Sequence, residues 1–113
     1  MNKLQNRLLD YNVRVYNIIK SFDKDPLLYD TKSQLLRASS SPGANYSEAQ
    51  SASSRKDFHN KIRIALKEMR ESFYWLQFFN RISKPNDQLD SLLEESEELC
   101  KILSAIAFKT QKP

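Results

Sequence analysis

Six side chains between positions 63 and 81 are spaced three or four residues apart and could bind an anionic partner together. In order they are Arg63, Lys67, Arg70, Tyr74, Gln77 and Arg81. On a helix this spacing places them on one face, and Lys56 lies two turns earlier on the same line. Cationic groups bind phosphate oxygens, and an aromatic ring stacks on a base. The pattern therefore predicts a face that binds nucleic acid, with RNA the preferred candidate over DNA. The candidate cations of this face are Lys56, Arg63, Lys67, Arg70 and Arg81.

The alternative for this stretch is an ordinary solvated helix face, in which Lys67 pairs with Glu71 one turn away. The distribution of charge is relevant to the choice. Residues 55–84 carry eight basic and three acidic side chains, a net +5, whereas residues 1–54 sum to +2 and residues 85–113 to −3. The net charge of +4 therefore originates mainly in the segment that holds the basic residues.

The sequence offers little for catalysis or metal binding. A serine nucleophile needs an adjacent base, and His59 is the only histidine, so a surface or interface role suits it better. Cys100 is the only cysteine and is flanked by leucines, as a small buried side chain would be. The four glutamates at 94, 95, 97 and 98 lack the Glu-x-x-His motif of di-iron bundles. We therefore expect no enzymatic activity, no cofactor and no metal.

Aromatic side chains are concentrated near the end of the same segment and face more than one direction. They are Phe73, Tyr74, Trp75, Phe78 and Phe79. One bundle core covers only one stripe of a helix, so the remaining rings must be covered elsewhere. The cover is either the preceding segment or a second molecule, because aromatic residues are enriched at the centres of interfaces. The alternative function is accordingly a structural or protein-docking module that binds a partner through this aromatic surface.

A polar stripe precedes the basic segment, at Arg37, Ser41, Asn45 and Glu48. Ser41 and Asn45 fall near the expected edge of the core, where polar groups need internal hydrogen bonds. We interpret the stripe as structural, holding helices together, and not as a reaction site.

The elements that position these residues are four helices, expected at 2–22, 26–53, 55–82 and 87–109. Breaks are indicated by Asp25-Pro26, by a serine-rich stretch that ends at Ser54, and by Pro85 before Asn86 or Asp87. Pro42 should kink the second helix. With 113 residues, one glycine and four prolines, we expect a single all-α domain over 1–113. Its architecture should be an up-down-up-down antiparallel four-helix bundle, with Leu66, Met69 and Leu103 buried.

No apolar run approaches the roughly 18 residues that a membrane span needs. The first residues also lack the apolar region of a signal peptide. A cytoplasmic protein without membrane contact is expected.

The stretch 34–49, with Arg37-Ala38, Ser41, Asn45 and Glu48-Ala49, resembles the signature of a family of four-helix bundles. The family is named for proteins encoded in intervening sequences of 23S ribosomal RNA. The resemblance continues through Ser54-Arg55-Lys56-Asp57-Phe58, Ile64-Ala65-Leu66-Lys67-Glu68 and Glu71-Ser72-Phe73-Tyr74-Trp75-Leu76. The chain has Ala49 where many members have glycine, and Pro42 where isoleucine or valine is common.

The resemblance implies a homopentameric ring of bundles without enzymatic activity. The chain is also similar to the accessory proteins of diversity-generating retroelements, which bind a reverse transcriptase and nucleic acid. A reverse transcriptase is therefore one protein partner that the resemblance implies, beside RNA or DNA and further copies of the chain itself.

Overall fold

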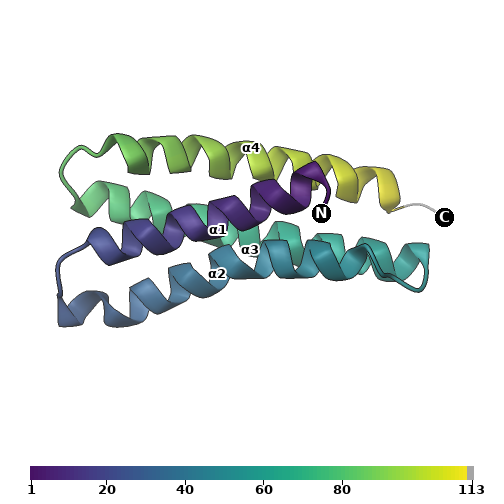
Figure 1. The fold of residues 1–113 in the computed structure, drawn as a ribbon, viewed down its shortest axis with the longest axis horizontal. Coiled ribbons are helices and arrows are strands. Elements are labelled where there is room, and N and C mark those ends of the chain that lie inside the picture. Colours follow the sequence, from purple (N-terminus) through teal and green to yellow (C-terminus); the bar gives the residue numbers. More distant parts are fainter. Residues whose placement is uncertain (112–113) are drawn as a thin grey trace.

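The computed structural model describes residues 1–111 as four long helices joined by short connections (Figure 1). They are α1 (Lys3–Ser21), α2 (Tyr29–Ala49), α3 (Arg55–Ile82) and α4 (Asp87–Thr110), with a 3₁₀ turn, η1 (Pro26–Leu28), before α2. Successive helices run in opposite directions along a body of 47 × 23 × 22 Å. α1 and α3 each pack against both α2 and α4. The predicted all-α, up-down-up-down bundle is confirmed.

Side-chain caps determine where the helices start. At α1 the side chain of Asn2 accepts a hydrogen bond from the Gln5 amide at 2.8 Å, and the Gln5 side chain accepts from the Asn2 amide at 2.7 Å. Ser54 Oγ accepts from the Asp57 amide at the start of α3, and Asn86 Oδ1 accepts from the Leu89 amide at the start of α4. Such caps satisfy backbone donors that have no partner within the helix. The start predicted at Ser54 is therefore confirmed, and of the two candidates for the fourth helix, Asn86 and Asp87, the cap is Asn86.

The second helix is shorter than the predicted 26–53. Asp25 accepts a hydrogen bond from the Leu27 amide at 3.0 Å, and Pro26 begins a 3₁₀ turn, so the α-helix starts only at Tyr29. At the other end the amides of Ser51 and Ala52 bond three residues back, which closes a turn after Ala49. The predicted bounds of 26–53 were therefore wrong at both ends, whereas the predicted breaks at Asp25-Pro26 and in the serine-rich stretch that ends at Ser54 are confirmed.

Pro42 lies inside α2 without ending it. The hydroxyls of Ser39 and Ser40 donate to the Leu36 carbonyl at 2.9 and 2.6 Å. Both a helix-interior proline and such serine bonds favour a bend. The axis of α2 changes direction near its middle in Figure 1, as the prediction of a kink requires.

The core runs the length of the bundle and receives side chains from all four helices. The three residues predicted to be buried are so, with exposed fractions of 8% for Leu66 and 0% for Met69 and Leu103. α1 and α2 approach closely at Gly43, where a Cβ atom would lie 3.5 Å from the Cβ of Leu8. Within residues 1–111, no helix is long and apolar enough to cross a membrane.

Candidate nucleic-acid interface

The centre of the basic stripe lies on the outer face of α3. Arg63, Lys67 and Arg70 are exposed, while the opposite side of the same turns carries Ala65 and Met69 into the core. The three cations line one shallow hollow of about 600 Å³, together with Asn60, Ile64 and Leu66. The structure therefore brings together the three central residues of the predicted nucleic-acid-binding face. We call Arg63, Lys67 and Arg70 the α3 basic face.

Within residues 1–111, no carboxylate forms an ion pair with a side chain of the α3 basic face. In the part of the chain that the structure describes, ion pairs form only between Arg7 and Glu95, at 2.8 Å, and between Lys61 and Glu48, at 2.9 Å. The solvated-face alternative pairs Lys67 with Glu71, but within residues 1–111 these two side chains form no ion pair. Glu71 instead accepts a hydrogen bond from the indole of Trp75 at 3.3 Å. The positive charge of this face is therefore available to a ligand.

The two outer candidates lie in different surroundings. Lys56 is exposed in the first turn of α3, at the same end of the bundle as Arg63. Arg81 is exposed at the opposite end, where it lines a hollow with Glu94 and Glu97 of α4. Two carboxylates beside one guanidinium reverse the sign of the local charge. Arg81 therefore lies apart from the α3 basic face, although it follows the same helical spacing.

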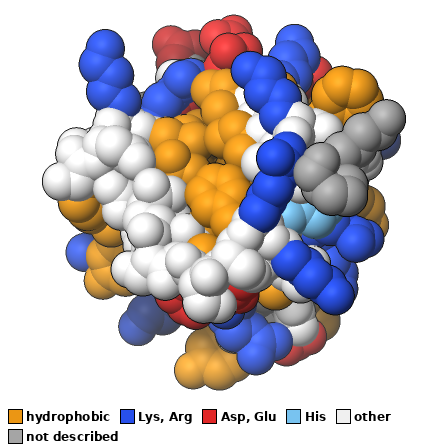
Figure 2. All heavy atoms as spheres, turned by 90° about the vertical axis from the view of Figure 1, so that its right-hand side faces the viewer, with side chains coloured by type: hydrophobic (Ala, Val, Ile, Leu, Met, Phe, Trp, Pro, Cys, Tyr) orange, Lys and Arg blue, Asp and Glu red, His pale blue; other side chains and the backbone are white. Residues whose placement is uncertain are grey.

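Lysine and arginine side chains also surround the end of the bundle that holds the α2–α3 connection and the C-terminal end of α4 (Figure 2). There the Arg55 side chain donates to the Lys109 carbonyl at 2.9 Å, and His59 Nδ1 lies 2.8 Å from Thr110 Oγ1. His59 is half-buried in this contact between α3 and α4. His59 therefore contributes to the packing of α3 against α4.

The aromatic residues of α3 contact one another in a row that continues into the core. Tyr74, Trp75, Phe78 and Phe79 meet in edge-to-face pairs, and Phe79 continues to Phe22 at a centroid distance of 4.8 Å. Phe79 is 0% exposed and packs against Phe22, the residue that follows α1. The expectation that Phe79 lies at an oligomer interface was therefore wrong. Phe73, Trp75 and Phe78 are half-buried, and Tyr74 remains 60% exposed. Most of this apolar surface is therefore buried within one chain.

One residue of the polar stripe of α2 forms a hydrogen bond to another helix. Glu48 accepts a hydrogen bond from Lys61 of α3, whereas Asn45 donates to Ser41 Oγ at 2.9 Å within α2 itself, and Arg37 is exposed. Side-chain bonds between α1 and α2 come instead from Asn12, whose Oδ1 accepts from Ser40 at 3.1 Å, and from the cap residue Asn2, whose side chain donates to Tyr46 Oη at 3.2 Å. The expectation of a connecting role is thus met by Glu48, while Ser41 and Asn45 bond locally.

Sequence reasoning missed a buried hydroxyl cluster at the centre of the bundle. Tyr11 Oη lies 2.6 Å from Ser72 Oγ and donates to Ser96 Oγ at 3.2 Å, which links α1, α3 and α4. Desolvation raises the pKa of Tyr11 to about 12, against the opposing effect of its two serine partners. A signal for this cluster existed, because Ser72 and Ser96 are polar residues at core-facing positions of apolar helices.

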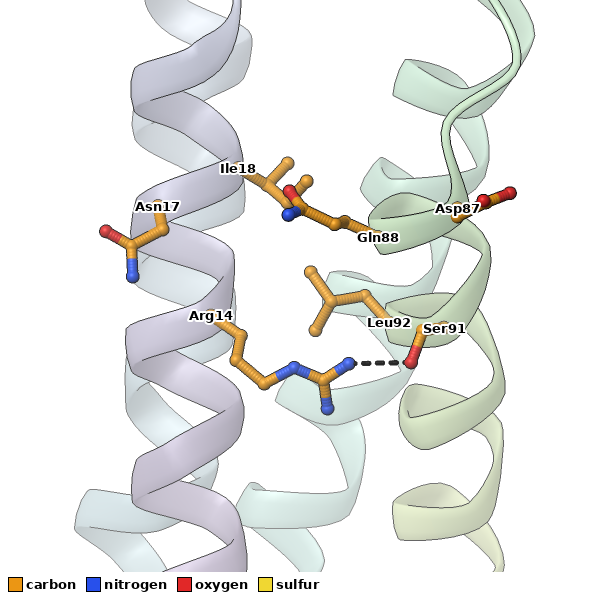
Figure 3. A pocket seen from close by; sticks show the side chains of 7 residues that line it. All are labelled: Arg14, Asn17, Ile18, Asp87, Gln88, Ser91 and Leu92. Atoms are coloured by element: carbon orange, nitrogen blue, oxygen red, sulfur yellow. Dashed lines mark hydrogen bonds between the residues drawn. The ribbon is translucent and has the colours of Figure 1, made fainter.

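A further hollow of about 380 Å³ separates α1 from the first turns of α4 (Figure 3). Arg14 reaches across it and donates to Ser91 Oγ at 2.8 Å, and Asp87 and Gln88 lie at its rim. Its one cation already has a partner within the chain. Across residues 1–111, no three His, Cys, Asp or Glu side chains gather as a metal site would require.

These features define a class of protein: a small antiparallel four-helix bundle with an unpaired cationic face on one helix. The model of one family, described as 23S rRNA-intervening sequence protein, matches residues 2–105. The chain therefore belongs to this family, as the sequence resemblance indicated.

A solved structure supports the same assignment. It is the crystal structure of a protein with unknown function from the S23 ribosomal protein family of Bacteroides thetaiotaomicron VPI-5482. That protein is 36% identical to this chain, the match covers 92% of this chain and 97% of the other, and the TM-score is 0.83. No curated protein matches.

Proposed function

We propose that this protein is a non-enzymatic, self-associating bundle that binds nucleic acid, RNA before DNA, through the α3 basic face. The observation that carries the proposal is the position of Arg63, Lys67 and Arg70: exposed, adjacent and without a carboxylate partner in the described chain. Phosphate contacts supply most of the affinity of sequence-independent binding, because they release condensed counterions. Binding with little sequence preference is expected.

Support for self-association comes from α1, whereas the aromatic residues of the sequence suggested α3. Leu9, Val13 and Tyr16 lie on the outer side of α1, each about half exposed, and their spacing of four and three residues forms one apolar stripe. An apolar helix face of this kind favours burial against another molecule. We infer that α1 contributes to contacts between copies, and five copies is the number that the family resemblance implies.

An assembly would strengthen binding without any new contact. Each copy presents the same α3 basic face, so a nucleic acid long enough to reach two faces binds with an avidity above that of one face. A modest charge on each protomer can then support useful affinity. The protein-docking alternative is weaker, because Phe79 is buried and Tyr74 is the only well-exposed member of the aromatic group in the described structure.

An electrophoretic mobility assay with single-stranded RNA at low salt tests the proposal. The wild-type protein should shift the RNA, and the triple variant Arg63→Glu, Lys67→Glu and Arg70→Glu should not. A matched control changes Lys24, Arg37 and Lys84 to Glu, which alters net charge equally at exposed positions outside the α3 basic face. This control should retain most of the shift, while circular dichroism and light scattering show unchanged helicity and mass for both variants.

Two results would contradict the proposal. The first is an absence of any shift by the wild-type protein at low salt, which would identify the basic residues as a solvated face. The second is an equal loss of binding in both triple variants, which would mean that total charge matters and the α3 basic face does not.

A further inference from the structure

Arg70 belongs to two neighbouring hollows and so connects α3 with α4. One is the hollow of the α3 basic face, and the second, of about 560 Å³, lies mainly on α4. The second hollow is lined by Arg70, Glu97, Cys100, Lys101, Ser104, Ala105 and Phe108. Arg70 lies near enough to Cys100 for its charge to lower the pKa of that thiol, against the larger effect of burial. Two cations, Arg70 and Lys101, face one carboxylate, Glu97, in this hollow, so a net positive charge continues from α3 onto the C-terminal half of α4.

The charge of α4 changes sign along its length. Every acidic residue of the helix lies at or before Glu98, and Lys101 and Lys109 follow. Glu97 marks the boundary, because it lines the hollow of Arg81 as well as that of Arg70. A polyanion is therefore disfavoured at the hollow of Arg81 and favoured at the surface that holds Arg63, Lys67, Arg70 and Lys101.

Phe108 is an unusual residue to find at such a place. It is 73% exposed at the rim of the second hollow, and no aromatic pair of the described residues includes it. Ser104 and Ala105 beside it are small and exposed, so the ring is open to a planar ligand. An open aromatic ring beside two cations, here Arg70 and Lys101, is the arrangement that single-stranded nucleic-acid sites use, with bases on the ring and phosphates on the cations.

We propose that a single strand of nucleic acid crosses from α3 to α4 at Arg70, with phosphates on Arg63, Lys67, Arg70 and Lys101 and one unstacked base on the ring of Phe108. This inference rests on the proposed function and deepens it. It adds Lys101 and Phe108 to the site, excludes Arg81 from it, and specifies single strands, since the bases of a duplex are not free to stack on a side chain.

Fluorescence anisotropy with two labelled probes tests the inference. One probe is a 12-nucleotide oligouridine, and the other is an abasic oligonucleotide of the same length and charge. Phe108→Ala should weaken binding of oligouridine by about tenfold and leave binding of the abasic probe unchanged. Phe108→Trp should restore oligouridine binding, because the larger ring also stacks. Tyr29→Ala is the matched control, since Tyr29 is strongly exposed at the opposite end of the bundle.

The cation of α4 has a separate readout. Lys101→Gln should weaken both probes and lower the slope of log affinity against log salt by about 0.7, the value for one phosphate contact on a single strand. Phe108→Ala should leave that slope unchanged. Arg81→Gln should change neither affinity nor slope.

The outcomes separate this inference from the proposed function. If the wild-type protein binds oligouridine and Phe108→Ala binds both probes as tightly as the wild type, the stacking site is disproved while the proposed function stands. Equal weakening of both probes by Phe108→Ala would likewise overturn stacking. If the wild-type protein binds neither probe at low salt, the proposed function fails and this inference fails with it.

Discussion

The hydroxyl of Tyr11 lies 2.6 Å from the Oγ of Ser72, in the completely buried centre of the bundle. The two residues come from α1 and α3, which lie diagonally across the bundle, and Ser96 of α4 completes the cluster. Buried polar groups are costly unless they find partners, and here all three hydroxyls do. The cluster therefore specifies the alignment of three helices, which an all-apolar core would leave less defined.

The buried tyrosine predicts a loss of stability in alkali. Tyr11 titrates near 10 in the unfolded chain and at about 12 in the fold. The unfolded state releases its proton first, so the free energy of unfolding should fall by about 1.4 kcal/mol per pH unit between roughly pH 10 and 12. Urea denaturation over that range measures the slope. Tyr11→Phe is the control and should remove this contribution; an unchanged slope would show that other groups cause it.

Core packing predicts the cost of shortening buried side chains. Leu103→Ala should lower the free energy of unfolding by about 3–5 kcal/mol, through lost transfer energy and a cavity. Leu66→Ala should cost about 2–3 kcal/mol, because Leu66 also borders the open hollow of α3. Chemical denaturation of both variants checks the values and their order. A cost below about half a kcal/mol for Leu66→Ala would mean that its face was wrongly assigned.

Gly43 predicts a stabilising substitution. An added Cβ would meet Leu8 Cβ at an ordinary contact distance of 3.5 Å, and alanine is favoured over glycine in a helix interior. Gly43→Ala should raise the free energy of unfolding by about 0.5–1 kcal/mol. The reverse change at the exposed neighbour, Ala44→Gly, should lower it by a similar amount. Thermal unfolding distinguishes this from a true requirement for glycine, in which case Gly43→Ala would be less stable than the wild type.

The apolar stripe of α1 predicts a substitution that separates copies without unfolding them. Val13 is half exposed, so Val13→Glu should leave helicity intact while placing a charge in the proposed contact. Light scattering should show a multiple of the 13.2 kDa chain mass for the wild type and a smaller mass for the variant. Arg37→Glu, which places the same residue at an exposed position of α2, is the control and should keep the wild-type mass. A monomer mass for the wild type at micromolar concentration would contradict self-association.

The sequence predicted α3 to the residue, 55–82, because a serine cap and the approach to Pro85 define its ends locally. It misplaced both ends of α2. After Ala49 the chain turns toward α3, although the serines and alanine that follow are compatible with a helix. The burial of Phe79 depends on Phe22, more than fifty positions away, and periodicity within one helix carries no information about such a contact. The α3 basic face was predictable, since exposure of cations follows from one helix alone. The hollow that joins it to α4 was not, because it depends on how two helices align.

Binding of nucleic acid by the α3 basic face is tested most directly by the affinity for single-stranded RNA, measured over a series of salt concentrations. Log affinity should fall linearly with log salt, with a slope of about −2 or steeper, since each of three or more neutralised phosphates contributes roughly 0.7. The Arg63→Glu, Lys67→Glu, Arg70→Glu variant should show no binding at any salt concentration. A wild-type affinity that does not depend on salt, or a triple variant that keeps the wild-type slope, would show that the α3 basic face does not bind the RNA.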